Sequence, residues 1–145
     1  MDLNNLLNQN KIIKHNTSKR EIEDLLRVVE RDIKDSSIQG LSNDRKFITA
    51  YNAILQATTI LLYINGYKVK GEGHHYYTFI SARNFIDKTK EPLLSYFNAC
   101  RSKRNTSDYD RTGVISDSET KEIIEEAIGY FEYVKKEVEK ANINN

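Results

Sequence analysis

The sequence predicts an all-α protein built as an antiparallel bundle of four to six helices. Three observations support this prediction. Apolar residues recur at helical spacing through most of the 145 residues, residues that cap helices precede several of these stretches, and no stretch of useful length alternates as a β-strand does. A hydrophobic content of 39% with 30% charged residues, one proline and six glycines fits a single helical domain over residues 1–145.

The first clear helix follows an N-terminal segment, residues 1–16, that we expect to be loosely attached to the domain. This helix begins at Ser18, which stands at capping-box spacing from Glu21. Its apolar stripe continues to Ile33 and ends before a cluster of serines and a glycine. A short helix is also expected within the N-terminal segment.

The second helix is predicted over residues 43–65, with Ser42 as its N-terminal cap and Gly66 as its stop signal. Apolar residues cover most of its circumference and leave only a narrow polar strip. We therefore expect it to be the central helix, packed on several sides. Residues 67–73 carry two lysines, a glutamate and two glycines, and they predict a surface loop.

Three further helices are predicted in the second half of the chain. A short one spans about residues 74–86, and Pro92 is well placed in the first turn of the next. A polar loop over residues 106–115 is expected to end that helix. The last helix opens with Ser116 and Glu119 at capping-box spacing and carries a clear apolar stripe.

The most informative residue for function is Arg104, because it continues the apolar stripe formed by Leu93, Phe97 and Cys100. At about 100° per residue, Arg104 returns to within about 20° of the direction of Leu93. A guanidinium on a core-facing stripe is costly to desolvate unless an anion, a carbonyl or a partner subunit meets it. The alternative is that Arg104 binds the terminal carbonyls of its helix or an aspartate of the following loop.

The net charge of +1 conceals an uneven distribution along the chain. Residues 47–115 contain nine basic and five acidic side chains, whereas the C-terminal residues are mainly acidic. This allows a local positive surface, which we interpret as a candidate RNA-binding surface, although an ordinary charged helix end would look the same. Its basic residues are Arg101, Lys103, Arg104 and Arg111.

Several features taken together resemble the HEPN superfamily, and in particular its small stand-alone prokaryotic members. They are Ala50, Tyr51 and Asn52 in the central helix, the Gly71–His75 stretch, and Arg101, Lys103, Arg104 and Asn105 followed by Tyr109 and Asp110. The resemblance implies a helical bundle that forms a homodimer, with arginine-bearing helices facing each other across a cleft. Many members are metal-independent ribonucleases, and others are inactive partners in toxin–antitoxin or phage-defence systems, often alongside a nucleotidyltransferase.

The resemblance also implies a catalytic set of an arginine, a polar residue and a histidine four to six residues after the arginine. Arg104 and Asn105 match the first two, while Tyr109 stands where the histidine is expected. Arg104 would stabilise charge on the phosphate and Asn105 would orient the sugar. Tyrosine has an ordinary pKa near 10 against about 6.5 for histidine, so Tyr109 suits hydrogen-bond donation better than proton abstraction.

Two hypotheses for function therefore stay open. The first is an RNA- or nucleotide-interacting protein with a degenerate motif, with or without ribonuclease activity. The second is a non-catalytic interaction module, such as an antitoxin or scaffold, that binds a partner protein through the same residues. A comparison of RNA binding by the wild-type chain and an Arg104→Ala variant separates them.

The remaining candidate residues favour packing over chemistry, and no cofactor or metal is predicted. Cys100 is the only cysteine and lies on an apolar stripe, which indicates packing. His74 and His75 with Glu72 would need a compatible geometry to bind a metal, and a helix start is the better interpretation. His15 is expected to be an exposed loop residue, and most of the nine tyrosines are expected in the core or an interface.

The sequence predicts no membrane association. The densest apolar stretch, residues 54–64, is interrupted by polar side chains and falls short of the roughly 20 residues that a transmembrane helix needs. Residues 1–10 are rich in asparagine and lack the basic start and apolar centre of a secretory signal. We therefore expect a cytoplasmic protein.

Overall fold

The protein is mostly helical, with one small sheet. The structure is a computed structural model that describes residues 2–71, 75–109 and 115–143, with the side chains at 106–109 outside the description. This confirms the all-α prediction in its broad form. The elements are α1 (Leu3–Asn8), β1 (Ile12–Lys14), α2 (Lys19–Ser36), α3 (Asn43–Ile64), β2 (Tyr67–Val69), α4 (His75–Ala82), a 3₁₀ turn at Lys88–Lys90, α5 (Glu91–Tyr109) and α6 (Asp117–Ala141).

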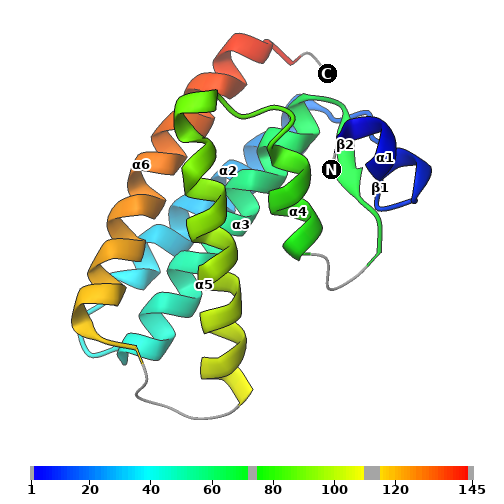
Figure 1. Ribbon diagram of the computed structural model, residues 1–145. Helices are drawn as coiled ribbons and strands as arrows, with labels where there is room; N and C mark the ends of the chain where they lie inside the picture. The colour runs from blue at the N-terminus through cyan, green and yellow to red at the C-terminus, as the bar shows by residue number, and fades with distance from the viewer. Residues whose placement is uncertain (1, 72–74, 110–114, 144–145) are drawn as a thin grey trace.

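Helix α3 is the central element, as its nearly uniform apolar surface predicts. It packs against α2, α4, α5 and α6, which surround it (Figure 1). Eleven of its residues are buried. By length and composition α3 would suit a membrane span, but 61% of its most apolar stretch is buried inside the protein. The helices around it remove this surface from water, which is what the core helix of a bundle requires.

Helix directions depart in part from the predicted antiparallel arrangement. The long helices α2, α3, α5 and α6 alternate in direction along the chain, so α3 and α6, which pack together, run in the same direction. The side-chain amide of Asn43 at the start of α3 donates to Asp117 at the start of α6, 2.7 Å away. Helix α4 departs from this alternation because it repeats the direction of α3: its first residue, His75, contacts Tyr51 in the first half of α3, whereas Phe85 beyond α4 stacks on Tyr67 beyond the end of α3.

The helix starts are confirmed at the predicted serines. The side chains of Ser18, Ser42 and Ser116 each accept a hydrogen bond from the backbone N–H three residues later. The side chain of Glu119 in turn accepts a hydrogen bond from the backbone N–H of Ser116, which completes a capping box. The predicted box at Ser18 is only half formed, because the carboxylate of Glu21 bonds to other side chains.

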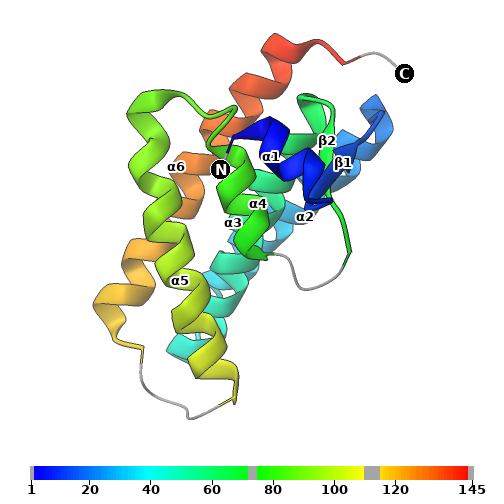
Figure 2. The same cartoon turned by 45° about the vertical axis from the view of Figure 1, so that its right-hand side comes forward.

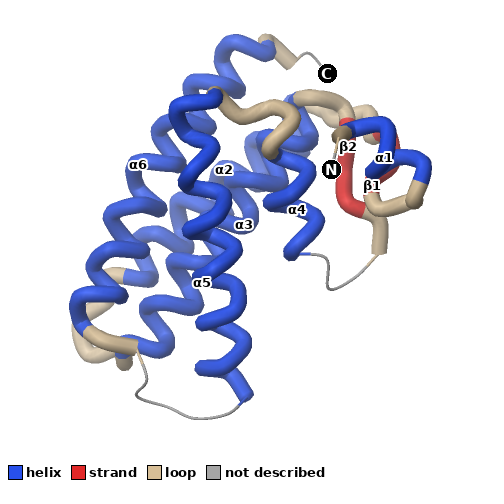
Figure 3. Tube along the Cα trace, in the orientation of Figure 1, coloured by secondary structure: helices blue, strands red, loops and turns tan. Residues whose placement is uncertain are grey.

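A small antiparallel sheet replaces the surface loop predicted over residues 67–73. Strand β1 pairs with β2 so that Ile12 lies opposite Val69 and Lys14 opposite Tyr67 (Figure 3). Each strand has only three residues, too few to show a period of two in the sequence. Gly66 adopts a positive φ of 90° in the turn before β2, and the two strands are defined by their pairing with each other. Neither feature can be inferred from composition.

The sheet joins the N-terminal segment to the bundle. Leu6 and Ile12 are completely buried, and β1, β2 and α1 form one unit beside α4 (Figure 2). Lys11 belongs to this unit, and its carbonyl accepts a hydrogen bond from the backbone N–H of Lys70 at 3.0 Å. We call α1, β1 and β2 the N-terminal unit. Its buried residues lie outside the continuous core of the bundle.

His15 contacts Glu21 and Tyr63 at the end of this unit, contrary to the expectation of an exposed loop residue. Its ring Nε2 lies 2.6 Å from Oε1 of Glu21, which also accepts a hydrogen bond from the hydroxyl of Thr17 at 2.7 Å. The ring packs on Tyr63 with a centroid distance of 4.4 Å. The carboxylate of Glu21 thus contacts both His15 and Thr17, and the side chain of His15 is only 18% exposed.

Helix α5 is longer than predicted. It continues through Thr106 to Tyr109, whereas the polar string after Asn105 predicted a loop. Threonine, serine and aspartate disfavour the helix by only about 0.5 to 0.7 kcal/mol per residue, which is far less than the cost of a proline. The chain contains no glycine or proline between Pro92 and Gly113, so nothing in this stretch forces the helix to end earlier.

Candidate functional site

Arg104 lies inward, as its place on the apolar stripe predicts. Phe97 and Cys100 of the same stripe are buried, and Arg104 is half-buried on α5 with its Nε shielded from solvent. Its guanidinium carbon lies 5.9 Å from the ring centroid of Tyr51, which α3 contributes. The ring of Tyr51 is 0% exposed. A guanidinium over the face of an aromatic ring gains electrostatic attraction while its edges keep their hydrogen-bond donors.

The hydroxyl of Tyr51 brings a histidine into the same place. Oη of Tyr51 lies 3.1 Å from Nδ1 of His75, the first residue of α4. Burial raises the pKa of Tyr51, and the positive charges of Arg104 and Arg101 offset only part of this rise. Tyr51 therefore stays neutral near pH 7, and its hydroxyl can donate to or accept from the imidazole.

Arg101 lies one helical turn before Arg104 and also rests on a tyrosine. Its guanidinium carbon is 5.6 Å from the ring centroid of Tyr76 on α4, and its Nε donates to the side-chain oxygen of Asn98 at 2.9 Å. Tyr76 is 41% exposed, so this pair lies at the surface while the Arg104 pair lies deeper. We call Tyr51, His75, Arg101 and Arg104 the arginine cluster.

A column of aromatic rings supports the arginine cluster from the core. Starting at Tyr51, the ring centroids follow one another at 6.1 Å to Phe79, 5.9 Å to Phe97 and 4.8 Å to Tyr130. Each ring comes from a different helix, α3, α4, α5 and α6 in that order. Such edge-to-face and tilted contacts are favourable beyond the apolar area they bury. The column therefore fixes how α5 lies against α3 and α4.

Lys103 is separated from the arginine cluster. Its ammonium group pairs with Glu119 on α6 at 3.0 Å, and both residues line a cavity of 160 Å³ with Cys100 and Phe47. The charge of Lys103 lowers the pKa of Glu119, although the backbone N–H of Ser116 contributes more. Lys103 thus connects α5 to α6 through an ion pair with Glu119.

The other predicted site residues differ in how far the structure places them. Asn105 is exposed on α5, within the helix and not at its end. Tyr109 is the last residue of α5, but its side chain lies outside the described part of the protein. Arg111 lies outside the described residues altogether, as do Glu72 and His74.

Two members of the arginine cluster were not among the site residues that the sequence predicted. The sequence predicts most tyrosines in the core or an interface, and Tyr51 is buried. It predicts His75 at a helix start, where the structure places it. Tyr51 and His75 are 24 residues apart, so no spacing rule connects them. Within the described ranges, no group of three histidine, cysteine or carboxylate side chains is arranged to hold a metal ion.

Comparisons with known proteins identify no relative. No protein-family model, no curated protein and no solved structure matches this chain.

Proposed function

We propose that this chain is a cytoplasmic, HEPN-like protein that binds RNA through the arginine cluster. The observation that supports the proposal is the placement of two guanidinium groups on tyrosine rings, Arg104 on Tyr51 and Arg101 on Tyr76. Each guanidinium lies within cation–π range of a ring, and a guanidinium binds phosphate through its N–H donors. The two cations are therefore pre-arranged to bind the sugar–phosphate backbone.

The position of the arginine cluster in the fold favours an anionic ligand. Helices α4 and α5 contribute its two arginines and its histidine, and the aromatic column holds these helices against α3. Side chains whose geometry is set by packing lose little conformational entropy on binding. The resemblance to HEPN proteins, with Arg104 and Asn105 in the matching order, makes RNA the ligand that we propose.

Cleavage of the bound RNA is a second proposed activity, favoured by the presence of an imidazole. The α5 motif has Tyr109 where HEPN ribonucleases have a histidine, but His75 lies in the arginine cluster through its contact with Tyr51. An imidazole has an ordinary pKa near 6.5 and exchanges protons at neutral pH. In this proposal His75 takes the proton of the 2′-hydroxyl, the freed 2′-oxygen bonds to phosphorus and the P–O5′ bond breaks, while Arg104 stabilises the charge on the phosphate. The leaving 5′-oxygen takes a proton back from the protonated imidazole or from water.

Homodimerisation belongs to the same proposal, because it would place two arginine clusters across one cleft. The competing proposal is a non-catalytic module in which Arg104 docks a partner protein, for instance a nucleotidyltransferase or a toxin that the chain neutralises. Both proposals use Arg104, but only the first makes it a ligand of RNA.

Fluorescence anisotropy with labelled single-stranded RNA tests the first proposal. We expect Arg104→Ala to weaken binding by about tenfold or more, because a charge-assisted hydrogen bond contributes about 1.5 to 3 kcal/mol. Arg104→Lys keeps the charge but loses the planar fork, so it should fall between the wild type and the alanine variant. Arg27→Ala removes the same charge from an exposed position on α2 and should leave the affinity unchanged.

Circular dichroism of each variant shows whether the fold survives. Equal affinity of the wild type, Arg104→Ala and Arg27→Ala would refute the RNA-binding proposal. The same samples on denaturing gels report cleavage, which should disappear in His75→Gln while binding remains.

A further inference from the structure

A row of alternating cations and aromatic rings extends from the arginine cluster across α4 to the N-terminal unit. The guanidinium carbon of Arg101 lies 5.6 Å from the ring centroid of Tyr76, and the rings of Tyr76 and Tyr77 meet edge to face at 5.2 Å. The ammonium group of Lys11 lies 4.9 Å from the ring centroid of Tyr77. We call these four residues the cationic aromatic row.

The row is open to solvent at its middle. Tyr76 is one of three large hydrophobic residues that are exposed among those the structure describes, while Arg101, Tyr77 and Lys11 are half-buried. A tyrosine that served only the core would be covered, as Tyr51 and Tyr130 are. Tyr76 instead presents ring surface to solvent beside a guanidinium.

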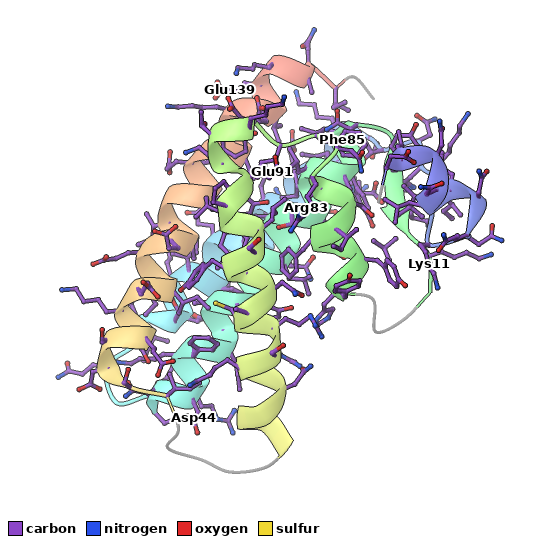
Figure 4. All side chains as sticks on the ribbon, viewed as in Figure 1. Lys11, Asp44, Arg83, Phe85, Glu91 and Glu139 are labelled. Atoms are coloured by element: carbon purple, nitrogen blue, oxygen red, sulfur yellow. The ribbon has the colours of Figure 1, made fainter. Side chains whose placement is uncertain are left out.

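The backbone fixes both ends of the row. Lys11 precedes β1, and the hydrogen bond that its carbonyl accepts from Lys70 holds it to the strand pair. Figure 4 labels Lys11 at the lower end of the N-terminal unit, and its contact with Tyr77 directs it toward α4. Tyr76 and Tyr77 belong to the first turn of α4, directly after His75. The row thus begins at Arg101 of the arginine cluster and ends on a segment that the sequence predicts to be only loosely attached.

We propose that the cationic aromatic row is a base-stacking subsite for single-stranded RNA, continuous with the arginine cluster. An unpaired base stacks on Tyr76, and the phosphates on either side of it are bound by Arg101 and Lys11. Aromatic rings flanked by cations are the arrangement by which proteins hold single strands without reading their sequence. The bases of a duplex already stack on each other, so the subsite selects single-stranded RNA.

This inference rests on the proposed function, since it extends the same RNA from the arginine cluster toward the N-terminal unit. It specifies the strandedness of the ligand, and it adds Tyr76 and Tyr77 of α4 and the N-terminal unit to the binding surface. It also assigns roles to Tyr76 and Lys11.

Anisotropy titrations of intact protein with labelled oligouridine, and with a duplex RNA of the same length, test the inference. We expect Tyr76→Ala to weaken binding of the single strand by about 5- to 150-fold, the range found for removing one stacking ring. Tyr76→Phe keeps the ring and should retain the affinity. Binding of the duplex should be weaker from the start and unaffected by either variant.

A matched pair of lysine variants tests the far end of the row. Lys11→Gln should lower the affinity for the single strand and reduce the slope of its salt dependence by about 0.7, as expected for one lost phosphate contact. Lys14→Gln removes an exposed charge three residues later in the same unit and should change neither quantity.

The outcomes separate this inference from the proposal on which it rests. If oligouridine binds and Arg104→Ala weakens it, while Tyr76→Ala and Lys11→Gln bind as the wild type does, the subsite is refuted and the arginine cluster stands. Preference for the duplex would also refute the subsite. If the wild-type protein binds no RNA, the subsite and the proposed RNA-binding function are both refuted.

Discussion

A buried hydroxyl pair between the central helix and α6 allows a sharp test of the packing that supports the arginine cluster. The hydroxyl groups of Thr58 and Tyr130 lie 2.9 Å apart, and the two residues are 0% and 2% exposed. The hydroxyl of Thr58 also donates to the carbonyl of Ile54 at 2.8 Å. Because Thr58 has only one hydroxyl proton, Tyr130 must be the donor in the pair.

This direction predicts unequal costs for the two deletions. Tyr130→Phe removes the donor and leaves Thr58 bonded to Ile54, so the free energy of unfolding should fall by about 1 kcal/mol. Thr58→Val removes the acceptor and leaves the hydroxyl of Tyr130 buried without a partner, which should cost about 2 kcal/mol. In the double variant no polar group is stranded, so the loss should return to about 1 kcal/mol.

Urea denaturation followed by far-UV circular dichroism measures all four proteins. Non-additivity of about 2 kcal/mol is expected, well above the roughly 0.5 kcal/mol within which independent sites add. Because both substitutions nearly conserve volume, cavity effects stay small. Additive losses, or a greater loss for Tyr130→Phe than for Thr58→Val, would refute the assigned direction of the hydrogen bond and the burial from which the magnitudes follow.

Three further predictions concern single residues. Burial raises the pKa of Cys100 to about 11, so at pH 8 only about one thiol in a thousand is ionised. Native protein should therefore react with a disulfide reagent far more slowly than unfolded protein does. Equal reaction rates would contradict the burial of Cys100. The hydrogen bonds of Glu21 outweigh the effect of burial and lower its pKa. Glu21→Gln should therefore be less stable than the wild type above about pH 4.5, and the two stabilities should converge as the pH falls below that value. Glu30→Gln, on the exposed face of α2, should show no such pH dependence. Ser116→Ala should cost about 1 kcal/mol through loss of the capping box, and Ser118→Ala in the same helical turn almost nothing; thermal melts that show equal shifts would argue against the cap.

Local signals in the sequence predict the helix starts well and the helix ends less well. Ser116 and Glu119 carry the whole signal for a capping box within four residues, and the structure forms it. The extension of α5 past Asn105 depends on a balance of small propensities over several residues, in which no single residue is decisive. The pairing of β1 with β2 depends on two short segments about fifty residues apart, so no local pattern could reveal it.

The candidate site shows the same division between local and long-range information. The inward direction of Arg104 follows from the helical period alone, and it was predictable. What Arg104 meets was not, because Tyr51 and His75 reach it only through the packing of α3, α4 and α5. Spacing rules assign a partner along one helix, and they therefore predict Tyr109 as the partner of Arg104.

The aromatic column explains why an arginine is tolerated at the end of an apolar stripe. Phe97 lies two helical turns before Arg104 on the same face, and its contacts with Phe79 and Tyr130 fix the rotation of α5. That rotation brings the guanidinium over the ring of Tyr51, where the attraction between cation and ring offsets part of the cost of desolvation. A leucine at position 104 would pack on the same ring without the cost of desolvating a charge. If the proposed RNA phosphate binds at the edge of the guanidinium, it gives arginine an advantage at this position that leucine cannot have.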